Sequence, residues 1–292
     1  MAPWSNENAP ILPRKDAVIV VDPFSTGMCL VDSLLQRGYA CVSVISDTEE
    51  AMKDWMDTLP IVWRKNFIGE FFHDAKDHSE EGLQKLLHGI RALRYNVIGV
   101  IAGAEPGVKL TDLLSERMGL TTNGSAGSEG RRNKYVMGEK IRAAKLRAVK
   151  QCLATSWKQA KKYITNTLKP EPFKVIVKPV DSAGSDDVTL CKSMNEVKKA
   201  FRQAMGKINH LGIENQSLLV QEYLQGTEYV VDTVSRNGVH KVVAVWEYDK
   251  REANGAAFVY YGAILREAQG DVILPIVNYI FKVLGKSDAC NK

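Results

Sequence analysis

The sequence predicts an α/β fold, with an open parallel sheet in its N-terminal part and antiparallel strands in a later α+β part. Ala17–Val21 and Cys41–Ile45 are apolar runs on either side of a helical pattern. A strand–helix–strand unit of about 30 residues implies parallel strands. Further along, Arg236-Asn237-Gly238 contains the Asn-Gly pair that is typical of a two-residue hairpin turn between antiparallel strands.

Residues 1–125 are predicted to form the first, open α/β domain. Ser25-Thr26-Gly27 offers capping groups for a helix over Met28–Gln36, and Gly38 ends that helix. The elements expected next are a helix over Glu80–Tyr95, a buried strand over Val97–Ile101, a turn over Gly103–Gly107 and a helix over Leu110–Met118 closed by Gly119. The pattern of Ile61–Phe72 fits no single structure.

The second part follows a stretch rich in Gly and Ser, Gly124–Gly130, which is typical of a linker. We expect two helices after it, over Lys134–Cys152 and around Ser156–Thr167. The later elements expected are strands over Phe173–Pro179, Val188–Cys191, Leu218–Tyr223, Glu228–Ser235 and Lys241–Tyr248, with a helix over Asn195–Met205. The predicted division is therefore 1–125, 126–217 and 218–292.

Composition narrows the function classes. The 292 residues are 45% hydrophobic, and the net charge of +5 comes from 39 basic and 34 acidic residues spread along the chain. A surplus of this size does not indicate nucleic-acid binding. No apolar run approaches the roughly 20 residues of a membrane span, and Met1–Asp16 has no signal-peptide pattern. Five cysteines without a CxxC pair favour a reducing compartment, so we expect a soluble, cytoplasmic protein.

A lysine stands at the end of an apolar strand, in Val177-Lys178-Pro179. Burying an unpaired ammonium costs on the order of several kcal/mol, so this amine must reach solvent or an anion. Ser182-Ala183-Gly184-Ser185 follows, and small residues let backbone N–H groups approach an anion closely. On its own, the pattern also fits an exposed lysine beside an ordinary turn.

A second pattern begins with the apolar strand Leu218-Leu219-Val220 and continues as Gln221-Glu222-Tyr223-Leu224-Gln225-Gly226-Thr227-Glu228. Peptide groups at a strand end can recognise the edge of an adenine, and a carboxylate a few residues later can accept hydrogen bonds from both ribose hydroxyls. An amphipathic strand that enters a turn is the alternative interpretation.

The order and spacing of three motifs resemble the ATP-grasp superfamily, which includes biotin carboxylase, D-alanine–D-alanine ligase, carnosine synthase and the bacterial L-amino-acid ligases. The motifs are Arg131-Arg132-Asn133-Lys134, then Val-Lys-Pro with Ser-Ala-Gly-Ser, then Val-Gln-Glu-Tyr-Leu-x-Gly-x-Glu. Asp22-Pro-Phe-Ser-Thr-Gly, Gly103-Ala-Glu-Pro-Gly-Val and Trp246-Glu-Tyr-Asp-Lys250 resemble the amino-acid ligase and carnosine synthase branch. The resemblance implies a pre-ATP-grasp domain, then a small lobe, then a large lobe that begins at residue 218.

The resemblance also implies an ATP site. Its nucleotide-binding residues would be Lys134, Lys178, Ser182, Ala183, Gly184, Ser185, Gln221, Glu222, Tyr223, Leu224 and Glu228. The two lysines would contact phosphates, and Gln221 stands where many members place a glutamate that faces the adenine amino group. Glu222 and Leu224 would offer backbone groups to the adenine, and Glu228 would hold the ribose. Lys250 would be the catalytic contact to the γ-phosphate or acyl phosphate.

The magnesium ligands of the family are not found in the sequence. Members hold Mg²⁺ with acidic and Asn residues and place a catalytic arginine nearby, in a pattern of an acidic residue, a gap and Glu-x-Asn-x-Arg. Neither Glu267 nor Asp271 lies in such a pattern. In the family, a helix like Leu274–Leu284 precedes the metal-bearing strands. We therefore expect a C-terminally truncated large lobe, no metal-ligating residues in this chain, and weak or absent ligase activity.

Three function classes remain in view. The first is an ATP-dependent ligase that joins a small carboxylate to an amine through an acyl phosphate. The second is a non-catalytic nucleotide-binding or regulatory module. The third is an NAD(P)-dependent oxidoreductase built on the first domain, which is disfavoured because the first strand–helix turn, Asp22–Gly27, lacks the G-x-G-x-x-G pattern.

Overall fold

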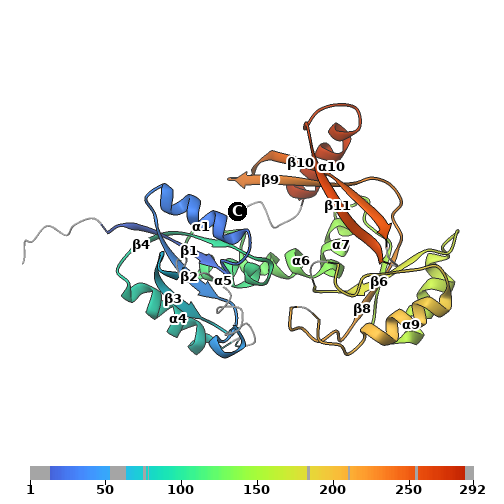
Figure 1. Ribbon diagram of the computed structural model, residues 1–292, viewed down its shortest axis with the longest axis horizontal. Helices are drawn as coiled ribbons and strands as arrows, with labels where there is room; N and C mark the ends of the chain where they lie inside the picture. The colour runs from blue at the N-terminus through green and yellow to red at the C-terminus, as the bar shows by residue number, and fades with distance from the viewer. Residues whose placement is uncertain are drawn as a thin grey trace, which may run out of the picture. The chain divides into compact units, whose positions relative to one another are not determined.

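The computed structural model describes residues 14–52, 64–74, 77, 79–182, 185–209, 211–253 and 256–286. The chain divides into two compact units, residues 1–122 and 123–292 (Figure 1). Among the helices in the described ranges, none combines the length and the apolar character needed to cross a membrane.

The first unit is built on a parallel sheet with the strand order β3-β2-β1-β4. Its elements are β1 (Asp16–Val21), α1 (Gly27–Gln36), β2 (Ala40–Ile45), β3 (Phe67–Phe72), α4 (Glu80–Ala92), β4 (Asn96–Ala102), η1 (Glu105–Gly107) and α5 (Val108–Arg117). Side chains of α4 and α5 pack on one face against Ile19 and Val21, and α1 packs on the other face against Val20 and Cys41. The predicted parallel sheet is confirmed, and the described part of the undecided segment supplies its edge strand β3.

Glycines allow the turns after β1 and β4 to pack backbone against backbone. A Cβ added at Gly103 would lie 2.6 Å from the carbonyl oxygen of Asp22, and one added at Gly27 would lie 2.6 Å from the carbonyl oxygen of Gly103. Asp22 is itself left-handed, with φ of 52°, and its carboxylate accepts a hydrogen bond from the Ser46 N–H at 2.7 Å. These contacts hold the carboxyl ends of β1, β4 and β2 together.

The second unit begins with the short η2 (Ser125–Gly127) and α6 (Ser128–Arg132), where the linker was predicted, and with α7 (Lys134–Ala143). An antiparallel sheet of order β5-β8-β6-β7 follows. Its strands are β5 (Gln151–Ala154), β6 (Val175–Pro179), β7 (Thr189–Cys191) and β8 (Leu218–Glu222), and its helices are α8 (Trp157–Tyr163), continued by the π-turn η3 (Ile164–Leu168), and α9 (Met194–Ala204). Our division placed β8 at the start of the third region, whereas β8 pairs inside this sheet.

The two faces of this sheet have different roles. Val175, Val177, Leu218 and Val220 lie in one core cluster with residues of α8 and α9. Successive side chains of a strand point to opposite faces, so Lys178 and Gln221 lie on the face away from that core. The sheet therefore presents a lysine and a glutamine on the face opposite its apolar packing.

A three-stranded antiparallel sheet of order β11-β10-β9 completes the second unit. Its elements are β9 (Glu228–Arg236), β10 (Val239–Ala253), β11 (Ala256–Arg266) and the helix α10 (Ile273–Lys286). Asn237 and Gly238 have φ of 52° and 73°, and Arg236 pairs with Val239, so the predicted two-residue hairpin is confirmed. The strand β11 was not predicted from the sequence. Side chains of α10 pack on Val245.

The helix predicted over Lys134–Cys152 is wrong in its second half. The helix α7 ends at Ala143, where Lys145 adopts φ of 60° and the Leu146 N–H donates to the Ile141 carbonyl at 3.2 Å. This is the bonding of a Schellman motif, in which glycine normally occupies the left-handed position. A lysine stands there instead, so the sequence contains no glycine or proline that would signal the helix end.

Replacing Gly103 by alanine is expected to destabilise the first unit. The new methyl group would lie 2.6 Å from the Asp22 carbonyl oxygen and 2.9 Å from the Pro23 Cα, which are backbone atoms that cannot move aside freely. Overpacking of this kind costs about 1–3 kcal/mol, measured as a lower midpoint of denaturant unfolding. Gly99→Ala is the matched control on β4, because nothing lies within 4 Å of its Cβ position. Equal midpoints for the two variants would contradict the proposed close packing.

Candidate functional site

Lys178 has a charged amine and lies at a largely buried strand end. It lies in β6 between the buried residues Val177 and Pro179. Burial is the main cause that lowers the pKa of the Lys178 amine to about 8, the charge of Lys134 lowers it further, and Glu228 acts in the opposite direction. The Lys178 and Lys134 amines are therefore close enough for their charges to interact, and an anion placed beside them would stabilise both charges.

Lys134 reaches this site because the start of α7 is fixed to the chain that follows β6. The side chain of Asn133 caps the helix and accepts a hydrogen bond from the Tyr135 N–H at 3.0 Å. The Lys134 N–H donates to the Val180 carbonyl at 3.1 Å, and its amine donates to the Ser182 carbonyl. The structure thus brings the two predicted lysines together.

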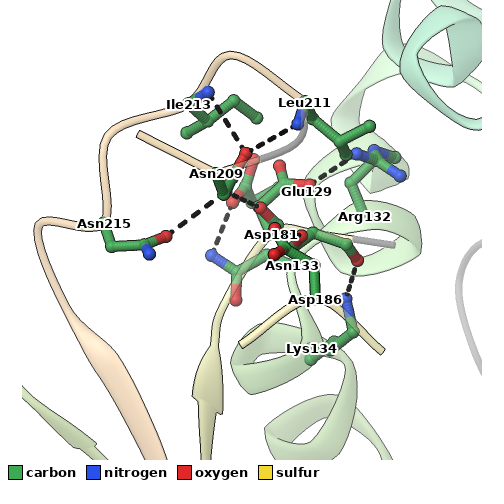
Figure 2. A network of polar contacts seen from close by, with 11 residues as sticks. Glu129, Arg132, Asn133, Lys134, Asp181, Asp186, Asn209, Leu211, Ile213 and Asn215 are labelled. Atoms are coloured by element: carbon green, nitrogen blue, oxygen red, sulfur yellow. Dashed lines mark hydrogen bonds and ion pairs between the residues drawn. The ribbon is translucent and has the colours of Figure 1, made fainter. Parts of the chain in front are cut away.

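A polar network connects the start of α7 to the chain that follows β6, through residues that include Arg132, Asp181 and Asn209 (Figure 2). Arg132 is only 4% exposed, and its guanidinium forms an ion pair with the Asp181 carboxylate. The buried Asn209 donates from Nδ2 to the Asp181 carbonyl at 2.8 Å, and the Ser182 hydroxyl donates to Asp186 at 2.9 Å. The carbonyl that receives the Lys134 amine is therefore held on both sides.

The predicted phosphate loop is described only at its ends. Ala183 and Gly184 lie outside the described residues. Ser185 has φ of 63°, in the left-handed region, and its carbonyl accepts from the Val188 N–H at 3.2 Å. The hydroxyl of Ser182 is engaged with Asp186, so it would have to leave that partner to bind a phosphate.

The segment between β8 and β9 offers open peptide groups. Residues 223–227 belong to no strand, and within the described residues they make no backbone–backbone hydrogen bond. Leu224 is 61% exposed, Gly226 has φ of 144°, and the Lys174 amine lies 5.2 Å from the ring centroid of Tyr223. An exposed apolar side chain beside free N–H and C=O groups suits a flat heteroaromatic ring.

The two polar residues at the end of β8 are bound within the protein. Gln221 is 5% exposed, and its amide nitrogen donates at 2.8 Å to Oε1 of Gln151, directly across the β5–β8 pair. The N–H of Glu222 donates to the Lys150 carbonyl at 3.0 Å and so is not open to a ligand. Burial opposes ionisation of Glu222, but the Lys150 N–H and the Arg147 guanidinium hold its pKa below the ordinary value.

Sequence reasoning missed Gln151, because that residue was assigned to a helix. The signal that identifies it is its position directly opposite Gln221, which appears only once β5 is recognised as a strand. The network of Arg132, Asp181 and Asn209 was also missed, since its members are 49 and 28 residues apart in the sequence.

Glu228 and Lys250 are bound to each other. The Lys250 amine donates to both carboxylate oxygens, at 2.6 and 2.7 Å, and lies 4.3 Å from the ring centroid of Tyr260 and 5.2 Å from that of Tyr248. Burial opposes it, yet the Glu228 carboxylate holds the pKa of Lys250 above its ordinary value. The residues predicted to contact ribose and γ-phosphate are therefore partners, and each can turn to a ligand only when this pair opens.

Within the described parts of the chain, no three His, Cys, Asp or Glu side chains gather as the ligands of a metal ion would. A Mg²⁺ ion that binds together with a nucleotide usually contacts one or two carboxylates, several waters and the phosphates, so it does not require three protein ligands. The charged side chains around Lys178 include Lys134 and the Glu228–Lys250 pair. This composition favours an anionic ligand.

The chain is similar in part to a known protein family and to a curated protein. Residues 171–276 match the model of the ATP-grasp domain. The chain is also similar to dapdiamide A synthase of Enterobacter agglomerans, with 28% identity over 246 residues that cover 84% of this chain and 55% of that protein. The chain thus spans a little over half the length of this curated relative.

Solved structures share the fold. The L-amino acid ligase from Bacillus licheniformis superposes with a TM-score of 0.66 at 16% identity, covering 94% of this chain and 60% of that one. N5-carboxyaminoimidazole synthetase from Staphylococcus aureus, in complex with ADP, superposes with a TM-score of 0.64 at 15% identity, covering 94% of this chain and 64% of that one. The predicted architecture, a parallel sheet followed by ATP-grasp antiparallel sheets, is confirmed.

Lys178→Met is expected to stabilise the unliganded chain at pH 7. The lysine has a pKa of about 8 in the fold and about 10.4 in the unfolded chain. Between these values the unfolded state binds more protons, so the stability of the wild type rises with pH through this window. The advantage of the variant should be largest below about pH 8 and should shrink toward about pH 10.4.

Urea unfolding at a series of pH values measures this difference. Lys199→Met, at an exposed position of α9, is the matched control and should show no comparable trend. An advantage of Lys178→Met that stays constant with pH would show that the amine is not destabilised by burial.

Proposed function

We propose that the chain binds ATP on the face of the β5-β8-β6-β7 sheet opposite α8 and α9, because residues 171–276 match the model of the ATP-grasp domain. The observation that carries the proposal is the Lys178 amine, which is held at a pKa of about 8 with a second cation, Lys134, beside it. The negative charge of a triphosphate would stabilise the charged form of the Lys178 amine, which burial disfavours.

With the phosphates beside the two lysines, the positions of the adenine and the ribose can also be proposed. Residues 223–227 would receive the adenine, because their peptide groups are open and Leu224 offers an apolar contact. The Glu228–Lys250 pair would open on binding, so that Glu228 accepts from the ribose hydroxyls and Lys250 turns to the γ-phosphate. Ser182 and Ser185, with Ala183 and Gly184 between them, would close over the phosphates.

We further propose that the whole protein is an ATP-dependent ligase that joins a small carboxylate to an amine. A carboxylate oxygen attacks the γ-phosphorus, the bond from that phosphorus to the β–γ bridging oxygen breaks, and ADP leaves. The amine nitrogen then attacks the acyl carbon and loses a proton, while the carbon–oxygen bond breaks and inorganic phosphate departs. The similarity to dapdiamide A synthase and the fold shared with an L-amino acid ligase support this reaction class.

In that reaction, the side chains of this chain would orient the triphosphate and stabilise its charge. Lys134 and Lys178 would fix the non-transferred phosphates, and Lys250 would contact the transferred group. Preorganised cations beside a transferred phosphoryl group are the main protein contribution to such chemistry.

A second candidate function is a nucleotide-binding module without catalysis. The observation in its favour is that the described residues include no cluster of acidic or other metal-ligating side chains. Negative charge that develops on a transferred phosphoryl group is normally neutralised by metal ions. Binding requires only the cations and the open peptide groups, which are present.

Lys178→Met and Lys134→Met are each expected to weaken ATP binding by about 10- to 100-fold, because each removes a charge-assisted contact to phosphate. Isothermal titration calorimetry at pH 7 measures the dissociation constants. Lys199→Met should bind like the wild type. If both site variants keep the wild-type affinity, the phosphates do not lie at these lysines.

The 292-residue chain alone is expected to bind ATP but to release ADP weakly or not at all when Mg²⁺ and pairs of amino acids are supplied. The physical reason is the missing charge neutralisation among the described residues. A coupled assay of ADP release across a panel of amino acids tests this. Robust turnover that depends on both a carboxylate and an amine would contradict the expectation, and binding of NAD(P) without ATP would point to the oxidoreductase instead.

A further inference from the structure

A chain of hydrogen bonds runs from α7 to the buried amide of Gln221. The Glu139 carboxylate accepts from Nε2 of Gln151 at 2.9 Å and from Arg142 at 3.2 and 3.3 Å. Nε2 of Gln151 also donates to the Tyr135 carbonyl at 2.9 Å, and its Oε1 accepts from Nε2 of Gln221 at 2.8 Å. Both glutamines are buried.

The chemistry of these groups permits only one donor-to-acceptor direction along this series of hydrogen bonds. An ionised carboxylate and a peptide carbonyl accept hydrogen bonds and cannot donate them. The Gln151 amide, ahead of Arg142, holds the pKa of Glu139 below its ordinary value, so that carboxylate is ionised at neutral pH. Gln151 must therefore direct its NH₂ group to Glu139 and its oxygen to Gln221.

Gln221 in turn must present its own NH₂ group to Gln151. This leaves Oε1 of Gln221, which accepts no hydrogen bond from the described residues. Gln221 lies on the same sheet face as Lys178, since Lys178 pairs with Leu219, two residues before Gln221 on β8. The sheet face that holds the phosphate lysine therefore also holds an amide that is fixed as an acceptor.

Gly138 provides the space for this arrangement. A Cβ added at Gly138 would lie 2.4 Å from Nε2 of Gln151. Glycine is less favourable than alanine inside a helix. The helix α7 nevertheless has a glycine at the position where a larger residue would collide with the Gln151 amide.

We propose that Gln151, supported by Glu139 and Gly138, is a positioning residue that fixes Gln221 as a hydrogen-bond acceptor and thereby selects a purine with an amino group at C6 over one with an oxo group. The inference rests on the proposed ATP site, in which Gln221 lies beside the adenine. An amino group at C6 donates to Oε1 of Gln221, whereas an oxo group places a second acceptor against it. Rotating the Gln221 amide would accommodate the oxo group but would break the bond to Gln151.

ATP and inosine triphosphate test this directly, because they share ribose and triphosphate and differ at C6. Calorimetry is expected to show that the wild type binds ATP about tenfold more tightly than inosine triphosphate. In Gln151→Met the side-chain volume is nearly kept but the amide is lost, so Gln221 can rotate and the preference should fall to about twofold or less. Gly138→Ala should lower the preference as well, although it removes no hydrogen-bonding group.

Two controls separate this effect from others. Gln203→Met, at an exposed position of α9, should keep the wild-type preference. Lys178→Met should weaken the binding of both nucleotides by the same factor, because it affects only the shared phosphates.

The outcomes distinguish the base selection from the ATP site itself. Equal binding of the two nucleotides by the wild type, or an unchanged preference in Gln151→Met, overturns the inference and leaves the ATP site standing. A wild-type chain that binds neither nucleotide overturns both. If circular dichroism shows that Gln151→Met is unfolded, Glu139→Gln and Gly138→Ala decide the question, and a preference that stays at the wild-type value in both overturns the inference.

Discussion

The burial of one amine at the end of β6 is the constraint on which the proposed site depends. The Lys178 charge is disfavoured by its surroundings, and Lys134 is placed where it adds to that cost. A fold selected for stability alone would pair the buried Lys178 amine with a carboxylate. The second unit instead pairs the nearby carboxylate, Glu228, with Lys250. The buried charge of Lys178 therefore lowers the stability of the unliganded protein, and an anionic ligand that binds beside this amine would restore it.

The helix α7 connects the two ends of the proposed nucleotide site. Its first residue, Lys134, reaches the phosphate end, and its start is fixed by the Asn133 cap and by the bond to the Val180 carbonyl. One turn later, Gly138 and Glu139 hold the amide chain that reaches the purine end. Because a helix is rigid over such a length, a shift of its start moves both ends together. In the proposed site, the network of Arg132, Asp181 and Asn209 would therefore influence the recognition of both the phosphates and the base.

Much of the fold was predictable from local signals, and the errors have identifiable causes. Strands β1, β2, β4 and β6 are apolar runs bounded by turns. The charge of Lys178 at the end of an apolar strand suggested an anion site, but only the resemblance to the ATP-grasp superfamily assigned this lysine to the phosphates. The end of α7 was missed because a lysine takes the left-handed position, which then hid β5 and Gln151. The Glu228–Lys250 pair could not be predicted, since it depends on the register of β9 against β10, which includes a bulge.

Nucleotide binding and catalysis would depend on different contacts in the proposed site. Lysines that contact only the non-transferred phosphates stabilise the ground state and the transition state to a similar degree, and such uniform binding does not accelerate the chemical step. Acceleration requires interactions that strengthen as charge moves onto the transferred phosphoryl group and the leaving oxygen. Oxygen ligands that would hold a metal ion there are not grouped among the described residues, whereas the groups suited to the purine and the phosphates are. The proposed nucleotide site would therefore account for recognition of the purine and the phosphates, whereas acceleration of the reaction would depend on additional contacts to the transferred phosphoryl group.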